Sequence, residues 1–296
     1  MHPTIQQLLN DSPVLLDGAW GTELQRRGLA AGACPDAMNL NQPSVVFEVA
    51  RSYAEAGSQL ILTNTFGANR FRLAAYQLAD QTKEINRRGA QISKQAAGSS
   101  VKVFGSIGPS GKMLLTGEVT VEELEAAFRE QAEALAEGGV DGLVIETMSD
   151  LEEAQAALRA ARSTGLPVVV CMVFDAGKNK DRTMMGHTPE QVAQVLTEAG
   201  ADVVGANCGQ GIAGFIPICQ RMRTATALPL WMKPNAGLPE MEGDRVVYRT
   251  TPQEFASYVP ELVKAGASFV GGCCGTTPEF IRHIAAVLEK TQNNNQ

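Results

Sequence analysis

The chain has 296 residues, 44 % hydrophobic and 19 % charged, which suffices for a large core in one α/β domain or two small ones. Its net charge is −7 and its lysines and arginines are scattered, so we expect no nucleic-acid partner. No apolar run approaches the roughly 18 residues of a membrane span. The first residues also lack the basic and then apolar stretches of a signal peptide. We therefore expect a cytoplasmic protein without membrane contact.

Eight short runs rich in β-branched residues recur along the chain, each followed by a loop and a helix-like stretch. In order they are 14–19, 60–66, 101–108, 142–147, 167–174, 203–208, 229–236 and 269–274. Several lack polar alternation, which is typical of parallel strands covered on both faces. Capping-box spacing marks four of the intervening helices, at Thr120–Glu123, Ser149–Glu152, Thr188–Gln191 and Thr251–Glu254.

Four helix exits resemble one another: EAGSQLILTN, EGGVDGLVIET, EAGADVVGANC and KAGASFVGGCC. Their glycines (Gly57, Gly139, Gly200 and Gly266) are expected to end the helices in a left-handed conformation. These exits precede every second strand, so a double βα unit occurs four times, which predicts one (β/α)8 TIM barrel over residues 1–296. The tail 291–296 is expected to be disordered. An open doubly wound sheet is the alternative, but no GxGxxG follows the first strand.

In such barrels the active site lies at the C-terminal ends of the strands. The residues at those ends are Asp17, Asn64 with Thr65, Ser106, Glu146, Phe174, Asn207 with Cys208, Asn235, and Cys273 with Cys274. Many of these side chains are polar or can bind a metal. A random sequence would not place so many such groups at the same end of the strands. The sequence therefore predicts a reactive site there.

Three cysteines stand out among the six. Cys208 ends the sixth strand, and the adjacent pair Cys273 and Cys274 ends the eighth. Neighbouring strand residues face opposite sides of a sheet, so two adjacent ligands require the backbone to leave strand geometry. The flanking glycines allow this; they are Gly271, Gly272 and Gly275. Three thiolates with one open position match a zinc site built for chemistry.

The remaining three cysteines carry no such pattern. Cys171 and Cys219 are expected to be buried small hydrophobes, and Cys34 is expected to be incidental in a loop. A reducing cytoplasm favours thiols or metal ligands over disulfides. A vicinal disulfide between Cys273 and Cys274 is possible but strained.

Zinc bound by three thiolates is a poor Lewis acid, which argues against a hydrolase. It suits the binding of a substrate thiol as a fourth ligand, since a free alkyl thiol with a pKa of about 8.5 is mostly protonated at pH 7. The cysteines therefore predict alkyl transfer to sulfur, with Cys208, Cys273 and Cys274 as the catalytic residues.

Two carboxylates fit an amino-acid substrate. Asp17 and Glu146 end the first and fourth strands, on opposite sides of the barrel mouth, where both can accept hydrogen bonds from one ammonium. Alternatively each helps to begin the next turn or helix, or the two form a glycosidase-like pair. His187 is expected to contact a helix entry. The long segment 237–251 is expected to cover the site, with Tyr248 and Arg249 either reaching the substrate or lying in solvent.

The sequence resembles the homocysteine S-methyltransferase family, which includes the homocysteine-binding region of cobalamin-dependent methionine synthase and betaine–homocysteine methyltransferase. The likeness covers nearly the whole chain. It is carried by DGAWGTELQRRG, LTNTFGANR, SIGPSG, IETMSD, GANCGQG, KPNAGLP and GGCCGTTPEF.

The resemblance implies zinc on Cys208, Cys273 and Cys274, with Asn235 in the fourth position until the substrate thiol displaces it. It also implies that Asp17 and Glu146 bind the substrate ammonium, that backbone amides near Gly18 together with Thr65 bind its carboxylate, and that Asn207 shapes the zinc neighbourhood. Two positions depart from the family pattern: Trp20 stands where Met is frequent, and Lys233 where methionine synthases often have His.

The predicted function is zinc-dependent methyl transfer to homocysteine, giving methionine. The donor would be a methylated corrinoid protein or a small S-methylmethionine-like or betaine-like molecule, and the family branch favours the corrinoid. Two alternatives remain: another thiol or selenol acceptor, and a non-catalytic homocysteine- or zinc-binding module of a larger assembly.

Overall fold

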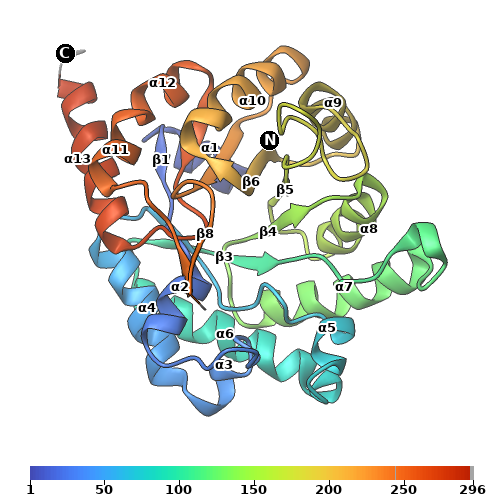
Figure 1. Cartoon of the computed structure of the whole chain (residues 1–296). Helices are drawn as coiled ribbons and strands as arrows, with labels where there is room; N and C mark the ends of the chain where they lie inside the picture. Colours follow the sequence, from blue (N-terminus) through green and yellow to red (C-terminus); the bar gives the residue numbers. More distant parts are fainter. Residues whose placement is uncertain (244, 294–296) are drawn as a thin grey trace.

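The computed structural model describes residues 1–243 and 245–293. A sheet of eight parallel strands runs in the order β1-β10-β7-β6-β5-β4-β3-β2, and a parallel bridge between Leu16 and Leu60 joins its two ends. Its strands are β1 (Val14–Leu15), β2 (Leu60–Leu62), β3 (Lys102–Ile107), β4 (Gly142–Met148), β5 (Val168–Met172), β6 (Val203–Gly211), β7 (Leu230–Asn235) and β10 (Ala267–Val270). The predicted TIM barrel is confirmed, and the open sheet is excluded (Figure 1).

Helices surround this barrel (Figure 1). They are α1 (Pro3–Leu9), α2 (Trp20–Arg26), α3 (Met38–Asn41), α4 (Pro43–Glu55), α5 (Arg70–Ala74), α6 (Thr82–Ala97), α7 (Val121–Glu137), α8 (Leu151–Arg162), α9 (Pro189–Glu198), α10 (Ile212–Ala225), α11 (Pro252–Ser257), α12 (Val259–Lys264) and α13 (Pro278–Asn293), with short 3-10 turns at Ala79–Gln81 and Leu114–Thr116. The tail expected to be disordered from residue 291 is helical as far as Asn293, and residues 294–296 lie outside the described part.

Of the four predicted capping boxes, two form completely, one forms in part and one is wrong. Complete capping boxes form at Thr120 and Thr188, and Thr251 accepts a hydrogen bond from the amide of Glu254. The box expected at Ser149 is wrong, because β4 continues to Met148 and Asp150 caps α8 by accepting from the amide of Glu152.

The four glycines at the repeated helix exits all have positive φ, with values of 104°, 89°, 89° and 115° at Gly57, Gly139, Gly200 and Gly266. A residue with a Cβ is strained in that conformation. The repeat seen in the sequence is therefore a repeat of one backbone turn that leads each helix into the next strand.

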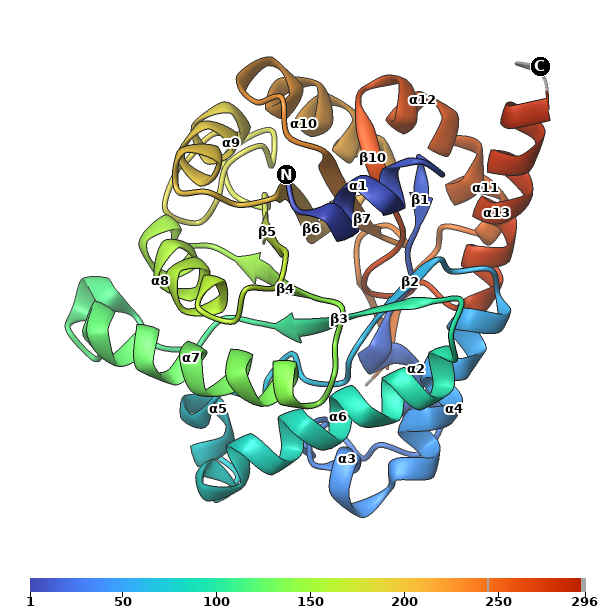
Figure 2. The same cartoon turned by 180° about the vertical axis from the view of Figure 1, so that it is seen from behind.

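Side chains fill the barrel interior. Trp231 stacks on Phe269 with ring centroids 5.3 Å apart and on Phe104 at 6.4 Å. Ile5 and Leu8 of α1 belong to the same interior cluster, and Figure 2 shows α1 lying across the barrel. Because the interior and one end are filled, space for a ligand exists at the other end.

The remaining elements follow β7. Residues of the long segment expected to cover the site form an antiparallel hairpin of β8 (Glu240–Glu242) and β9 (Arg245–Val247).

Cys171 and Cys219 are fully buried, as expected for small core residues. Within residues 1–243 and 245–293, no helix combines the length and hydrophobicity needed to cross a bilayer.

Candidate active site

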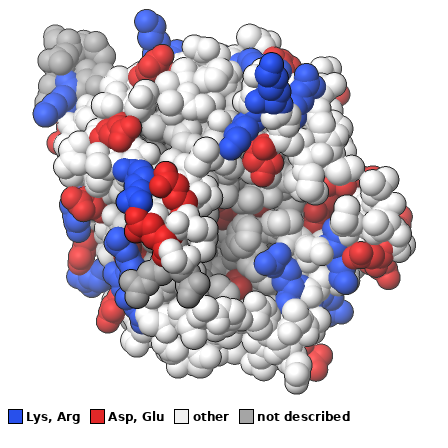
Figure 3. Space-filling model, in the orientation of Figure 1, with Lys and Arg blue, Asp and Glu red and all other residues white. Residues whose placement is uncertain are grey.

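A cavity of about 410 Å³ opens at the C-terminal ends of the strands. Its wall includes residues from β2, β3, β4, β6 and β7 and from the segments that follow β1, β2 and β10. Figure 3 shows the face of the molecule drawn in Figure 1, hollowed near its centre, with acidic and basic side chains interspersed around the hollow. The barrel thus offers a site at the end that the sequence predicted.

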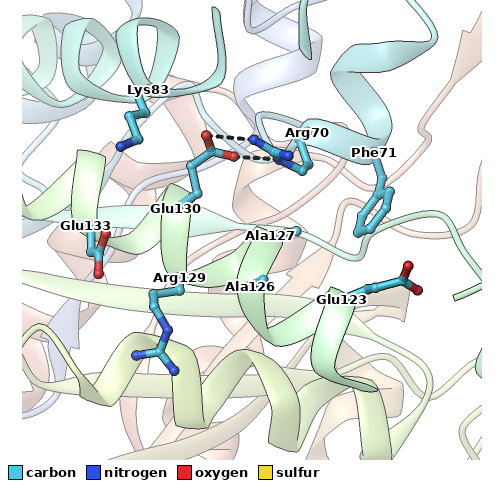
Figure 4. Close-up of a pocket in the computed structure, with 9 residues that line it drawn as sticks. All are labelled: Arg70, Phe71, Lys83, Glu123, Ala126, Ala127, Arg129, Glu130 and Glu133. Atoms are coloured by element: carbon cyan, nitrogen blue, oxygen red, sulfur yellow. Dashed lines mark hydrogen bonds and ion pairs between the residues drawn. The ribbon is translucent and has the colours of Figure 1, made fainter. Parts of the chain in front are cut away.

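A second hollow lies outside the barrel, between α5, α6 and α7 (Figure 4). Its most prominent contact is the ion pair of Arg70 with Glu130, which has N–O distances of 2.7 and 3.0 Å. Both side chains face solvent in part, so this pair resembles an ordinary surface interaction. We assign no function to this hollow.

The three predicted cysteines meet at the cavity. The sulfur atoms of Cys208, Cys273 and Cys274 all lie within 4.8 Å of one another, and the Cys208 and Cys274 sulfurs are 3.8 Å apart. All six cysteines of the chain are free thiols, so no vicinal disulfide forms. Cys208 has a φ of 63°, which is uncommon for a residue with a side chain and often accompanies a functional site.

Hydrogen bonds to the chain around β7 fix the cysteine pair. The amide of Cys273 donates to the carbonyl of Pro234 at 2.7 Å, and the amide of Ala236 donates to the carbonyl of Cys274 at 2.9 Å. Strand β10 ends at Val270, so the backbone leaves strand geometry before the pair, as predicted.

The glycines around the pair serve two different purposes. A Cβ at Gly271 would lie 2.6 Å from Cβ of Leu16, and one at Gly272 would lie 2.3 Å from Oγ1 of Thr276. These two glycines therefore permit close packing. Among the three, Gly275 has a positive φ, of 82°.

Gly275→Ala is expected to damage the cysteine cluster. The new Cβ would lie 2.4 Å from Cγ of Tyr248 and would add left-handed strain of about 1–2 kcal/mol. Gly139→Ala is the matched control, because φ there is 89° but nothing lies within 4 Å of the new Cβ. Metal-binding titrations should show weaker binding for Gly275→Ala alone. Equal metal affinity in the two variants would contradict the expected clash.

Without a cation, the three sulfurs do not all ionise together. Hydrogen bonds from Cys273 and Cys274 lower the pKa of Cys208 to about 3, while hydrogen bonding to Cys208 raises the pKa of Cys273 and that of Cys274. The cluster by itself thus favours one thiolate, on Cys208, and two thiols. A bound cation would let all three ionise.

Asn235 is a candidate for a fourth metal ligand. It ends β7 and is 4 % exposed, and its Oδ1 has no hydrogen-bond partner among the described residues. Its side chain also hydrogen-bonds Cys208, which helps to lower the pKa of that thiol. A buried oxygen without a partner is costly, so three sulfurs and this oxygen fit a four-coordinate metal ion.

Asn207 links the cysteine cluster to Glu146. Its Nδ2 donates to Oγ1 of Thr147 at 2.7 Å, to Oε2 of Glu146 at 3.4 Å and to the sulfur of Cys273 at 3.8 Å. Its Oδ1 accepts from the amide of Thr147 at 2.7 Å. Asn207 is therefore held by its neighbours, and it does not line the cavity itself.

Glu146 does line the cavity. Its Oε1 accepts a hydrogen bond of 2.5 Å from Oγ of Ser106. Burial raises the pKa of Glu146, an effect that the nearby Lys233 charge and the Ser106 hydrogen bond oppose. A carboxylate so placed is available to a ligand cation.

Asp17 lies beneath the cavity surface. It is fully buried and does not line the cavity. Its Oδ2 accepts hydrogen bonds from Nε1 of Trp20 at 2.9 Å and from the amide of Leu62 at 2.8 Å, and its Oδ1 forms an ion pair with Lys233. The sequence expected Asp17 itself to face the substrate, whereas the structure places Lys233 on the cavity wall.

The two residues expected near the substrate carboxylate differ in position. Gly18 lines the cavity. Thr65 is fully buried, and its hydroxyl donates to the carbonyl of Ser106 at 2.7 Å. The Thr65 side chain therefore supports the wall.

The segment after β7 contributes Tyr248. Its ring packs on Gly275, and burial raises the pKa of its hydroxyl. Arg249 faces solvent and pairs with Glu240 at 3.1 Å. Tyr248 and Arg249 lie in the same long segment, and the sequence alone did not distinguish the residue that packs near the cysteines from the one that faces solvent.

His187 lies just before α9, and its amide donates to Oγ1 of Thr183 at 3.1 Å.

Asp36 is a cavity residue that the sequence did not single out. Burial raises its pKa to about 6, although the amide of Gly67 and the charge of Arg72 oppose the shift. Because the folded protein holds this proton more tightly than the unfolded chain, stability falls as pH rises from about 4 through 6.

Asp36→Asn is therefore expected to raise the free energy of unfolding by about 1–3 kcal/mol at pH 8, with the gain shrinking as pH falls toward 4. Urea unfolding at several pH values would measure this. Glu55→Gln, on the exposed face of α4, is a control that should show no such trend. A gain for Asp36→Asn that does not vary with pH would be inconsistent with the shifted pKa.

Comparison with known proteins shows which family and which relatives this chain is similar to. The model of the homocysteine S-methyltransferase family matches residues 14–288. The methionine synthase of Mycobacterium leprae (strain TN) is 32 % identical over 295 residues, covering 93 % of this chain and 24 % of that protein. The methionine synthase of Mycobacterium tuberculosis (strain ATCC 25618 / H37Rv) is 30 % identical over 300 residues, covering 95 % and 25 %. The chain thus spans about a quarter of the length of these relatives.

Solved structures agree with the sequence comparison. The oxidized form of the homocysteine methyltransferase MmuM from Escherichia coli has a TM-score of 0.81 and 26 % identity, covering 96 % of this chain and 99 % of that one. Its metallated form has a TM-score of 0.80 at 26 % identity, covering 95 % and 99 %. By the match along nearly its whole length, the chain belongs to the homocysteine S-methyltransferase family.

Proposed function

We propose that this protein transfers a methyl group to the thiol of homocysteine, giving methionine, with zinc held by Cys208, Cys273, Cys274 and Asn235. One observation carries the proposal: three sulfurs from two distant stretches of chain meet at a cavity wall that Glu146 shares. Family membership and the existence of a metallated form of Escherichia coli MmuM support it.

When bound, zinc would keep the acceptor sulfur deprotonated at neutral pH. The chain's own residues do the rest. Glu146 offers a carboxylate to the acceptor ammonium, and Asn207 holds that carboxylate in place relative to Cys273. Asn235 would hold the metal together with the three cysteines. The trio Cys208, Cys273 and Cys274 would be catalytic because it touches the reacting sulfur through the metal.

The methyl donor must enter through the open end of the cavity. We propose a methylated corrinoid protein or a small sulfonium or betaine-like molecule, and the similarity to methionine synthases favours the corrinoid. We also propose that the protein works in the reducing cytoplasm, because its six cysteines are free thiols.

A donor panel tests the proposal. Purified zinc-loaded protein would be incubated with homocysteine and, separately, methylcobalamin, S-methylmethionine, betaine or methyl-folate, and methionine would be quantified. Formation of methionine with at least one donor, lost on zinc removal and restored by zinc, is the expected result. No methionine with any donor, despite one zinc per chain, would count against catalysis. A competition among thiol and selenol acceptors would identify the preferred one.

A further inference from the structure

The two positions that depart from the family pattern converge on one carboxylate. Trp20 donates its indole N–H to Oδ2 of Asp17 at 2.9 Å, and Lys233 forms an ion pair with Oδ1 of the same side chain. The amide of Leu62 adds a third donor at 2.8 Å. A carboxylate offers about four lone-pair sites, so the protein itself satisfies most of Asp17.

Lys233 stands between Asp17 and the ligand space. It is only 2 % exposed on β7, yet it lines the cavity, whereas Asp17 is fully buried and does not. Glu146 lines the same cavity from β4 and lies close enough for the two opposite charges to interact. The wall therefore carries two sets of opposite charges: Arg72 lies beside Asp36 near Gly67, and Lys233 of β7 lies near Glu146 of β4. The second set lies beside the buried Asp17, which pairs with Lys233.

We propose that Lys233 binds the carboxylate of the thiol acceptor, that Asp17 is the counter-ion that positions this lysine, and that Glu146 alone takes the acceptor ammonium. This assignment rests on the proposed function, since it concerns the acceptor of that reaction. It makes Lys233 a specificity-determining residue for acceptors that carry an acidic group.

Charge complementarity is the physical reason. A ligand ammonium directed at Asp17 would first meet the ammonium of Lys233, and like charges at close range in a partly desolvated site repel. A carboxylate in the same place is attracted, and Lys233 keeps two of its three N–H donors for it after bonding Asp17. A zwitterionic amino acid then finds an opposite partner for each of its charges, as buried charges require.

The support behind Lys233 explains why Asp17 is buried with three donors. A buried lysine needs a fixed counter-ion, or it loses more in desolvation than it gains. Trp20 and the amide of Leu62 hold the carboxylate through the oxygen that the lysine does not contact. Asp17 is therefore a positioning residue, acting through Lys233.

Isothermal titration with three thiols separates the roles. Homocysteine carries both charged groups, 4-mercaptobutanoate carries only the carboxylate, and 3-aminopropanethiol carries only the amine. In zinc-loaded Lys233→Met protein, affinity for the first two is expected to fall by about 10- to 100-fold, the value of a hydrogen-bonded charge pair. Affinity for 3-aminopropanethiol is expected to stay the same or rise.

The titration can also contradict the assignment. Equal weakening of all three thiols, or no weakening of 4-mercaptobutanoate, would overturn the role given to Lys233. Failure of all three thiols to bind the wild-type protein would instead refute the proposed function. Lys264→Met, at the end of α12 and outside the cavity, is the matched control and should bind all three thiols like wild type.

A separate experiment tests the role of Asp17. It also controls for misfolding, because Lys233→Met alone leaves the buried charge of Asp17 unpaired. Asp17→Asn is expected to weaken 4-mercaptobutanoate binding in the wild-type background but to add no further loss in Lys233→Met, whose double variant restores a neutral pair. Such non-additivity marks two residues that act as one unit. Equal losses in both backgrounds would show that Asp17 does not act through Lys233.

Discussion

Cys273→Ser is expected to abolish tight zinc binding and with it methyl transfer. The hydroxyl is a poor substitute for a thiolate, and loss of groups that merely support metal ligands already costs about 10- to 100-fold in affinity. Removing a ligand itself should therefore weaken zinc binding by at least about 100-fold. Zinc content after gel filtration, a chelator competition and the methionine assay would measure the effect.

Cys219→Ser is the matched control for this experiment. Cys219 is fully buried among the helices, so this variant also loses one thiol, but it leaves the cysteine cluster untouched. It should bind one zinc per chain and turn over normally. Stoichiometric, tightly held zinc in Cys273→Ser would contradict the proposed ligand set.

Glu146→Gln is expected to raise KM for homocysteine by about 10- to 100-fold, the cost of losing a hydrogen bond to a charged group. The glutamine oxygen can still accept the 2.5 Å hydrogen bond from Ser106, so the wall should keep its shape. Because the thiol–metal interaction is untouched, kcat should change much less than KM. Steady-state kinetics with varied homocysteine would separate the two parameters.

Glu153→Gln provides the comparison for Glu146→Gln. Glu153 is also a buried glutamate, and it accepts a hydrogen bond of 2.7 Å from the amide of Ser110. It does not line the cavity, so its replacement should affect stability and leave KM unchanged. If Glu146→Gln left KM at the wild-type value, the ammonium would have to bind elsewhere.

The sequence predicted an element correctly where the residues of that element alone are enough to identify it. The eight strands were predictable because both faces of a parallel barrel strand are buried, which leaves apolar runs without alternation. The exits at Gly57, Gly139, Gly200 and Gly266 were predictable because a left-handed turn favours glycine. Capping at Ser149 was predicted wrongly because a shift of one residue at the end of β4 moves the cap to Asp150.

The cysteine cluster was predictable for a similar reason. Barrel topology brings the ends of β6 and β10 to the two sides of β7, and adjacent cysteines among glycines pack poorly as core. Spacing alone therefore indicated that Cys208 would meet the pair, and the sulfurs do lie within 4.8 Å of one another.

By itself, the sequence determined the barrel, the end that carries the site and the three sulfurs, because these follow from periodicity, glycine turns and strand order. Tertiary structure alone decided which charged groups line the cavity. Asp17 and Lys233 are 216 residues apart, and only their side-chain directions show that the lysine covers the carboxylate. Orientation of a buried ion pair depends on packing from many strands at once, and no local pattern in the chain encodes it.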